Sequence, residues 1–446
     1  MHLLAATPGA VSDGSDAIDL GQSSGDVVFL SAADTELAVL SHARSAITDK
    51  NFPSLRLASL LHLSHNMSVD LYMDQTLSGA KLIIVRLLGG RGYWPYGIEQ
   101  LSELARKKGI MLALLPGDDQ PDAELVDYST LSPESCHRLW QYCVHGGPDN
   151  AQQFLRHAAS LVGVDGDWRE PTPLLKAGIY GAQSTDALKA DWTDGRPVAA
   201  LVFYRALMQA GNLAAVDGLV AALGDAGLNV MPLYVSSLKD PVAAATLATL
   251  FADASPDVIL NATGFAVSTP GADTIETPLS AIGVPVLQVV FSGSDMESWR
   301  DGQHGLSARD IAMNVALPEV DGNVLSRAVS FKGLDHRDDV CEADIVTYTP
   351  VTDRIDFVAR LAAKWAGLRN KNPADRKVAI ILANYPNRDG RIGNGLTNGG
   401  DTVLLVDATG DTVDIIFGEN WKSDQSQART PDGTFAGHTS LSNPEI

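Results

Sequence analysis

Residues 82–88 (LIIVRLL), followed at once by residues 89–97 (GGRGYWPYG), decide the fold of the first part of this chain. A run of seven residues with a single charge, followed by glycines, is typical of a strand that is buried on both faces. Residues 97–108 then carry apolar side chains at three-residue steps and end in Arg-Lys-Lys, which predicts an amphipathic helix. A second apolar run, residues 110–115 (IMLALL), comes next. Strand, helix and strand in this order predict a parallel sheet with helices on both faces.

The same alternation continues in both directions and predicts the fold class. We expect an α/β protein with two doubly wound parallel-sheet domains, of flavodoxin-like or periplasmic-binding-protein-like character. Residues 1–165 form the predicted N-terminal domain and residues 196–333 the second. Between them, residues 166–195 lose the apolar rhythm and carry prolines at positions 171 and 173, which indicates a connector.

Two more regions follow the second predicted domain. Residues 334–395 combine a helix, whose apolar side chains share one face, with an apolar strand at residues 377–382 that opens a further domain. Residues 396–446 are rich in Gly, Asp, Thr and Ser, and we expect a divergent, partly disordered tail. Only two short strands are predicted in that tail, around Val403 and Ile415.

Charge and composition exclude several classes of partner. The 33 basic and 54 acidic side chains give a formal net charge of −21, which repels nucleic acid and anionic lipid. No apolar run approaches the roughly 18 residues that span a bilayer, and the N-terminus lacks the basic start of a signal peptide. The three cysteines form no CxxC pair, so we expect reduced thiols and no zinc site. A cytoplasmic protein is predicted, with neither nucleic-acid nor membrane partners.

The common sequence motifs for nucleotide and metal binding do not occur in this chain. The chain contains no GxxxxGK[ST] loop, no HExxH, and no GxGxxG between a strand and a helix, so we expect no bound cofactor and no metal site. Residues 21–25 (GQSSG) fit the GxSxG pattern of a nucleophilic serine, which requires a strand before it and a helix after it. Here the motif precedes a strand, so a turn is favoured and no catalytic residue is assigned.

Histidines offer two candidates for a functional role. His62 and His65 stand three residues apart, but no acidic or histidine partner lies at a matching spacing, so a structural or surface role is favoured over metal binding. His304 lies in a polar loop that follows an apolar strand ending near Phe291. Loops at the carboxyl ends of parallel strands bind ligands in α/β domains, and a ligand contact for His304 rests on that position alone.

Two more loops follow predicted strands in the same way. In residues 89–97, glycines let the backbone approach a ligand, Arg91 adds charge, and Tyr93 and Trp94 offer flat faces that could stack on a macrocycle. An equally good alternative is a Gly/Pro turn whose aromatic side chains cap the edge of the sheet. Thr263, in the loop after the strand at residues 258–260, is a further candidate for ligand binding, although this loop can also be a simple strand-to-helix turn.

The most informative loop comes late in the chain. Residues 384–395 (NYPNRDGRIGNG) follow an apolar strand and bring together Asn384, Arg388, Arg391 and Asn394. Arginine forks bind carboxylates by two-point contacts, and asparagine amides donate or accept hydrogen bonds. These four residues are therefore candidates for binding the peripheral carboxylates or amides of a ligand, with a solvated turn as the alternative.

The segment 378–395 (VAIILANYPNRDGRIGNG) resembles a signature of the CobN/magnesium-chelatase H family. Other stretches resemble the cobalt branch of the family in the same order along the chain. These are residues 17–23 (AIDLGQS), 29–37 (FLSAADTEL), 89–97, 115–119 (LPGDD) and 316–322 (ALPEVDG). The resemblance covers about residues 1–395.

This resemblance implies a large, tetrapyrrole-binding subunit of a cobaltochelatase, an enzyme of aerobic cobalamin biosynthesis. Such a subunit holds hydrogenobyrinic acid a,c-diamide while cobalt(II) is inserted, and separate AAA+ partner subunits hydrolyse the ATP. The absence of a GxxxxGK[ST] loop in this chain agrees with that division of labour. The alternatives are a non-catalytic α/β module that binds a tetrapyrrole or another small ligand, and the H subunit of a magnesium chelatase, against which the opening motifs argue.

The chain departs from the family pattern after Gly395. Residues 396–400 (LTNGG) replace the expected continuation, and family members are more than twice as long. We therefore expect the N-terminal part of such a subunit, from a truncated or frameshifted reading frame and inactive alone. The metal-insertion residues would lie beyond it.

Overall fold

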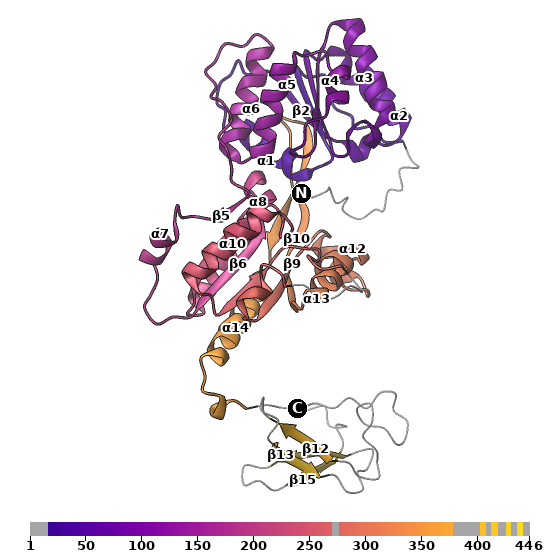
Figure 1. Cartoon of the computed structure of the whole chain (residues 1–446). Helices are drawn as coiled ribbons and strands as arrows, with labels where there is room; N and C mark the ends of the chain where they lie inside the picture. Colours follow the sequence, from indigo (N-terminus) through magenta and orange to yellow (C-terminus); the bar gives the residue numbers. More distant parts are fainter. Residues whose placement is uncertain are drawn as a thin grey trace. The chain divides into compact units, whose positions relative to one another are not determined.

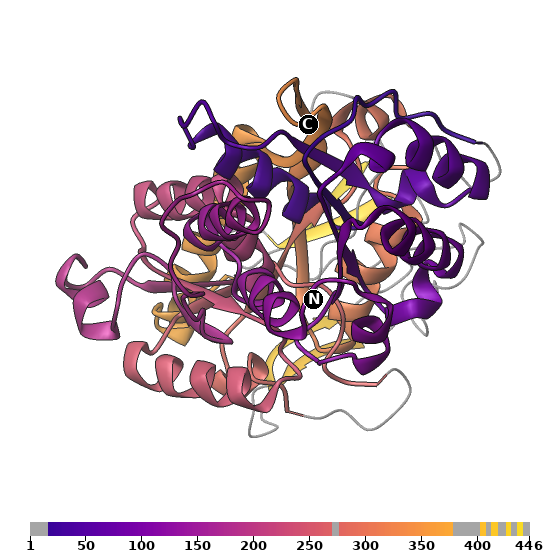
Figure 2. The same ribbon diagram turned by 90° about the horizontal axis from the view of Figure 1, so that it is seen from above.

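The computed structural model describes residues 17–269 and 276–377, together with the backbone of four strands within residues 402–439. The chain divides into two compact units, Met1–Lys371 and Asn372–Ile446, which are described separately. The first unit contains two α/β lobes, and helices flank the sheet of each lobe (Figures 1 and 2). The α/β class predicted from the sequence is confirmed.

The first lobe is built on a four-stranded, fully parallel sheet in the order β2-β1-β3-β4. Its strands have apolar side chains on both faces, because helices cover both. In β1, Val27 and Phe29 belong to one core, and Val28 and Leu30 belong to the other. The elements of this lobe are β1 (Val27–Ser31), α1 (Asp34–Ser45), β2 (Leu55–Ser59), α2 (Asn66–Gln75), β3 (Leu82–Leu87), α3 (Pro95–Lys108), β4 (Met111–Pro116), α4 (Ala123–Tyr128), α5 (Pro133–His145) and α6 (Pro148–Leu161), with short 3-10 helices at Leu60–Leu63, Leu77–Gly79 and Gly90–Tyr93.

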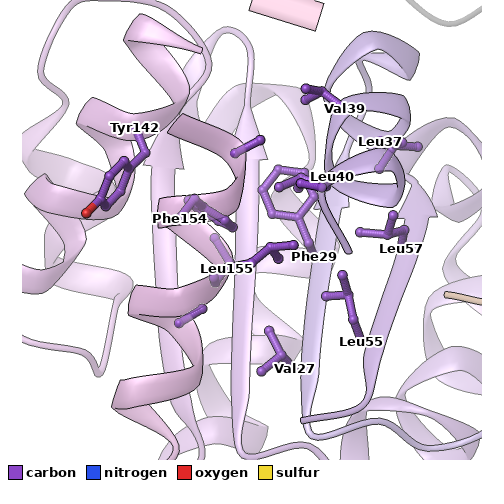
Figure 3. Packing of buried hydrophobic residues seen from close by; sticks show 14 of the residues in the cluster. Val27, Phe29, Leu37, Val39, Leu40, Leu55, Leu57, Tyr142, Phe154 and Leu155 are labelled. Carbon is purple, nitrogen blue, oxygen red and sulfur yellow. The ribbon is translucent and has the colours of Figure 1, made fainter. Parts of the chain in front are cut away.

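Helices α1, α5 and α6 cover one face of the first sheet, and α2, α3 and α4 cover the other. On the first of these faces, Phe29 packs edge-to-face on Phe154 with ring centroids 5.6 Å apart, beside Leu40 of α1 (Figure 3). A continuous apolar strand is thus stable here, because the side chains on both of its faces are buried under helices.

The second lobe contains a seven-stranded sheet in the order β11-β10-β9-β8-β6-β7-β5. Strands β6 to β9 and the start of β10 run parallel, while β5 and β11 pair antiparallel at the two edges. Helices α9 and α14 pack on one face, and α10 packs on the other. The elements are β5 (Ala177–Ile179), α7 (Thr185–Ala190), β6 (Val198–Tyr204), α8 (Arg205–Ala210), α9 (Ala214–Asp225), β7 (Asn229–Val235), α10 (Pro241–Ala254), β8 (Val258–Asn261), a 3-10 helix (Ser280–Ile282), β9 (Val286–Ser292), α11 (Met296–Asp301), α12 (Ala308–Asp310), a π-helix (Ile311–Ala316), α13 (Leu317–Val320), β10 (Val324–Asp338), β11 (Ala343–Pro350) and α14 (Thr352–Arg369).

The long hairpin β10–β11 joins the two lobes, and the sequence pattern did not predict it. Val329 and Tyr348 belong to the core of the second lobe, whereas Cys341, Ala343 and Ile345 near the tip belong to the core of the first. The boundary expected at residue 334 therefore falls inside a continuous strand. The helix predicted after it is present as α14, and its apolar face packs into the second core as expected.

The second unit contains a 3-10 helix at Pro373–Asp375 and two antiparallel hairpins. These hairpins are formed by β12 (Thr402–Val406) with β13 (Thr412–Phe417), and by β14 (Gln425–Arg429) with β15 (Phe435–Thr439). The strands predicted around Val403 and Ile415 are therefore confirmed, whereas the expectation of only two strands in this tail was wrong, because β14 and β15 form a further hairpin. The strand expected at residues 377–382 extends beyond the described part of the chain.

Candidate functional site

Each of the two sheets has a topological switch point, which is where open α/β sheets bind ligands at the carboxyl ends of their strands. In the first sheet β1 lies between β2 and β3, so the switch point is at the loops after β1 and β3. In the second sheet β6 lies between β7 and β8, so the loops after β6 and β8 take the same position. The predicted residues 91–94 and Thr263 lie in two of these four loops.

The carboxyl ends of both sheets meet at one junction between the lobes. Helix α1, which follows β1, packs against α8, which follows β6. Beside them, the Nζ of Lys332 lies 2.6 Å from an Oδ2 of Asp34, at the first turn of α1. These side chains are only 1% and 7% exposed, so this is a buried ion pair between the lobes. Burial lowers the pKa of Lys332, and the Asp34 carboxylate opposes that effect.

A second charged pair lies on the first-lobe side of the junction. The Nε of Arg86 in β3 donates to an Oε1 of Glu36 at 3.0 Å, and the hydroxyl of Ser31 donates to the other oxygen of Glu36 at 2.6 Å. Arg86 also donates to the carbonyl of Gly117 at 3.1 Å. These contacts fix the first turn of α1 to the ends of β1, β3 and β4. A charge inside the otherwise apolar run LIIVRLL is thus explained by a structural partner at the switch point.

A cavity of about 40 Å³ lies within the junction. Its lining is mostly apolar and comes from both lobes, with Phe29, Leu40 and Phe154 on one side and Ala206 and Ala210 on the other. Space of this size holds one or two water molecules or a comparably small apolar molecule. The junction as it stands is closed to a tetrapyrrole macrocycle.

Thr263 is part of a buried amide network rather than an exposed ligand contact. Its hydroxyl donates to the Oδ1 of Asn261 at 2.7 Å, and the amide of Asn261 donates to Gln288 at 2.9 Å. Asn323 donates to the same Gln288 oxygen at 3.1 Å. Thr263 itself is 1% exposed. It therefore holds the loop after β8 in place.

The end of this loop shows two features that cluster at functional sites. Phe265 has a φ of 66°, a left-handed conformation that costs a non-glycine residue conformational energy. Its amide donates to the carbonyl of Met313, which lies in the π-helix Ile311–Ala316. π-helices are rare and occur often at functional sites. The combination places local strain at the switch point of the second sheet.

His304 is exposed in the loop between α11 and α12, as expected for a surface loop after β9. Close to this loop in the chain, Asp310 is a buried residue that the sequence pattern did not identify. Its carboxylate accepts hydrogen bonds from the hydroxyls of Ser292, Ser294 and Ser307 at 2.8, 3.3 and 3.1 Å. These contacts tie the end of β9 to α12, which directly precedes the π-helix. In the sequence, only the spacing of the serines around Asp310 could have indicated these hydrogen bonds.

The two aromatic residues in the loop after β3 have different roles. Trp94 is 6% exposed and donates its indole N–H to the carbonyl of Leu63 at 2.8 Å, so the structure supports the sheet-edge alternative for this residue. Tyr93 is 37% exposed and keeps an accessible face. Arg91 forms surface ion pairs with Glu99 and Glu124, at 2.8 and 3.1 Å.

The remaining motifs behave as turns and caps. Residues 21–25 precede β1, and Ser23 contacts Arg56 and Glu342, which supports the turn over a nucleophile elbow. The Nδ1 of His65 accepts the amide of Met67 and caps α2, which is a structural role. The predicted ligand-binding residues Asn384, Arg388, Arg391 and Asn394 lie outside the described residues.

Residues 17–269, 276–377 and the four later strands contain neither a metal-binding cluster nor a membrane-spanning helix. Within that part of the chain, no three His, Cys, Asp or Glu side chains are grouped to hold a metal ion. Within the same part, no helix is both long and apolar enough to cross a membrane.

Comparison with known proteins identifies the family. The CobN/Magnesium Chelatase family model matches residues 140–399, more than half of the chain, and the chain belongs to this family. The aerobic cobaltochelatase subunit CobN of a Sinorhizobium species is 48% identical over 408 residues, which are 89% of this chain and 32% of that protein. The subunit of the same name from Pseudomonas aeruginosa is 43% identical over 401 residues, again 89% of this chain and 32% of that protein.

A solved structure supports the same assignment. The catalytic subunit of cobaltochelatase from Mycobacterium tuberculosis matches with a TM-score of 0.60 and 29% identity, over 82% of this chain and 29% of that chain. The chain spans about a third of the length of the curated relatives it matches.

Proposed function

We propose that this chain is the N-terminal part of the tetrapyrrole-binding subunit of an ATP-dependent cobaltochelatase. The whole subunit would hold hydrogenobyrinic acid a,c-diamide in the cytoplasm while cobalt(II), the second substrate, is inserted. One observation carries the proposal: the 48% identity to an aerobic cobaltochelatase subunit over 89% of the chain. Identity of this degree over both lobes favours the cobalt reaction over the magnesium one.

AAA+ ATPase subunits are the proposed partners. This chain has no GxxxxGK[ST] loop, and we propose that these partner subunits bind the phosphates of ATP. We propose that the partner subunits drive costly steps at the site, because cobalt must lose water ligands and the rigid macrocycle must release its inner N–H proton. A subunit built from two lobes around a junction can transmit work from these partners, since relative movement of the lobes changes the space between the carboxyl ends of their sheets.

The proposed contacts with the macrocycle come from the loop after β3 and from residues 384–394. Tyr93 keeps a face for stacking, and Arg388 and Arg391 would bind peripheral carboxylates with their guanidinium forks. The junction cavity of about 40 Å³ cannot hold the macrocycle. We propose that this part of the subunit contacts the substrate through the outer surface of these loops or after a separation of the lobes.

Titration of the chain with hydrogenobyrinic acid a,c-diamide, followed by visible absorption, tests the proposal. We expect a saturable spectral change with the chain alone, and cobalt insertion only by the whole subunit together with its AAA+ partners. Binding by the whole subunit without cobalt insertion would favour a non-catalytic module, and insertion of magnesium into a porphyrin would favour the magnesium branch. If the chain causes no spectral change, the loops at 91–94 and 384–394 are not a substrate site.

A further inference from the structure

Two arginines of the second lobe, near the starts of β10 and α14, are held against aromatic rings. The guanidinium carbon of Arg327 in β10 lies 3.5 Å from the ring centroid of Phe357 in α14. The guanidinium carbon of Arg354, in the first turn of α14, lies 4.7 Å from the ring centroid of Trp299 in α11. The Nε of Arg354 also donates to the carbonyl of Ala328. Because a ring covers one face of each guanidinium, its N–H donors point in fixed directions.

The two guanidiniums keep most of their hydrogen-bonding capacity. Within residues 17–269 and 276–377, neither forms an ion pair with a carboxylate, and the bond from Arg354 to Ala328 is the only hydrogen bond that either side chain makes. In the same part of the chain, none of their other nitrogen atoms is buried without a partner, so these atoms are accessible. Arg327 and Arg354 can therefore donate to an acceptor that comes from outside the lobe.

The electrostatics at these arginines favour an anion. Burial lowers the pKa of Arg354, and the positive charge of Arg327 lowers it further, whereas the carboxylate of Asp353 acts in the opposite direction. The first turn of a helix is also unfavourable for a positive charge, because the helix dipole is positive there. A carboxylate bound to both guanidiniums would offset the repulsion between them.

The start of β10 provides an irregular backbone and apolar surface beside these donors. The register of β10 against β9 shifts between Leu325 and Ala328, so Arg327 lies in an irregular stretch of the strand. Bulges of this kind redirect side chains and are frequent next to functional sites. Val324 and Leu325, which precede Arg327 on the same strand, are 47% and 49% exposed. A ligand that combines carboxylates with an apolar body fits this surface.

The position in the sheet agrees with a ligand site. Trp299 belongs to α11, which follows the carboxyl end of β9, and α/β sheets bind ligands at such strand ends. We propose that Arg327 and Arg354 form a subsite for the peripheral carboxylates of the tetrapyrrole substrate. The two terminal nitrogens of Arg354 can hold one carboxylate by a two-point contact. This inference rests on the proposed function, because it assigns two further contacts to the same substrate.

Visible-absorption titrations of the full chain with two ligands test the subsite. The first ligand is hydrogenobyrinic acid a,c-diamide, and the second is its fully amidated form, which has no carboxylate. We expect Arg327→Gln and Arg354→Gln each to bind the first ligand about tenfold or more weakly than the wild type does, because a charge-assisted hydrogen bond is lost. Binding of the second ligand should change much less, because its amides are neutral acceptors.

Arg360→Gln is the matched control for charge. Arg360 is exposed on the same helix, and its replacement changes the net charge by the same amount, so this variant should bind both ligands as the wild type does. Unchanged binding of the first ligand by Arg327→Gln and Arg354→Gln would overturn the subsite, and so would an equal loss for both ligands. If the wild type binds neither ligand, the proposed substrate site of this chain fails, and the subsite fails with it.

Lysine variants decide the question if a glutamine variant does not fold. Arg327→Lys and Arg354→Lys keep the charge but lack the planar fork of donors. Each should lose part of the preference for the carboxylate ligand over the amidated one. Full retention of that preference in both lysine variants would refute the two-point contact and the subsite.

Discussion

The buried ion pair between Asp34 and Lys332 gives the sharpest prediction for stability. Each side chain is nearly inaccessible, and the charged atoms lie 2.6 Å apart. In Asp34→Asn the Lys332 ammonium stays buried without this counter-charge, and in Lys332→Met the Asp34 carboxylate does. Removing one partner of a buried pair costs about 3–5 kcal/mol of unfolding free energy. The double variant removes both charges and should lie within about 1–2 kcal/mol of wild type, because neither desolvation penalty remains.

Urea unfolding of the full chain, followed by tryptophan fluorescence, measures these differences. Both single variants should unfold at clearly lower urea concentrations, and the double variant should recover most of the loss. The cycle of four proteins separates the pair from the rest of each side chain. Single variants that each cost less than about 1 kcal/mol would show that the pair is effectively solvated and refute the argument from burial.

Three other predictions concern particular side chains. Burial lowers the pKa of His157 to about 4, so the unfolded chain takes up the proton first and stability falls as the pH drops from 6.5 toward 4. In thermal melts at a series of pH values, His157→Phe should reduce this loss of stability at low pH. His304→Phe, at the surface, should leave the loss unchanged. A Cβ at Gly97 would lie 2.1 Å from the Trp94 ring, so Gly97→Ala should destabilise the chain by about 1–3 kcal/mol in urea unfolding. Gly92→Ala, where the space is open, is its control and should unfold like wild type. Arg388→Ala and Arg391→Ala should each weaken binding of hydrogenobyrinic acid a,c-diamide about tenfold or more in absorption titrations. Arg106→Ala on α3 should bind as wild type does, and equal loss in that control would mean a general charge effect.

Much of the first lobe could be predicted from local sequence, and the reason is physical. A parallel strand covered by helices on both faces must be apolar at nearly every position, so residues 82–88 and 110–115 can be recognised without knowing their neighbours. The helical face of α14 and the short strands near Val403 and Ile415 were recognisable for the same local reason. Family membership also followed from the sequence, because several motifs agree in order along the chain.

The hairpin that joins the lobes could not be predicted in this way. Strand β10 is exposed at its start, buried in its middle and exposed again toward its end, so it has no single period. Its burial depends on partners hundreds of positions away, such as Ser41, whose hydroxyl donates to Asp338 across 297 residues. Likewise, the sequence left open whether Trp94 stacks on a ligand or caps the edge of the sheet. In the structure its indole N–H donates to the carbonyl of Leu63, which supports the cap.

The sequence by itself thus determined the α/β class, the strands at residues 82–88 and 110–115, and the family. Tertiary structure alone decided which polar side chains are buried and how the lobes are joined. The local sequence pattern indicates which side chains of a segment face solvent and which face the core. A buried charge such as that of Lys332, however, is stable only when a distant residue supplies the opposite charge.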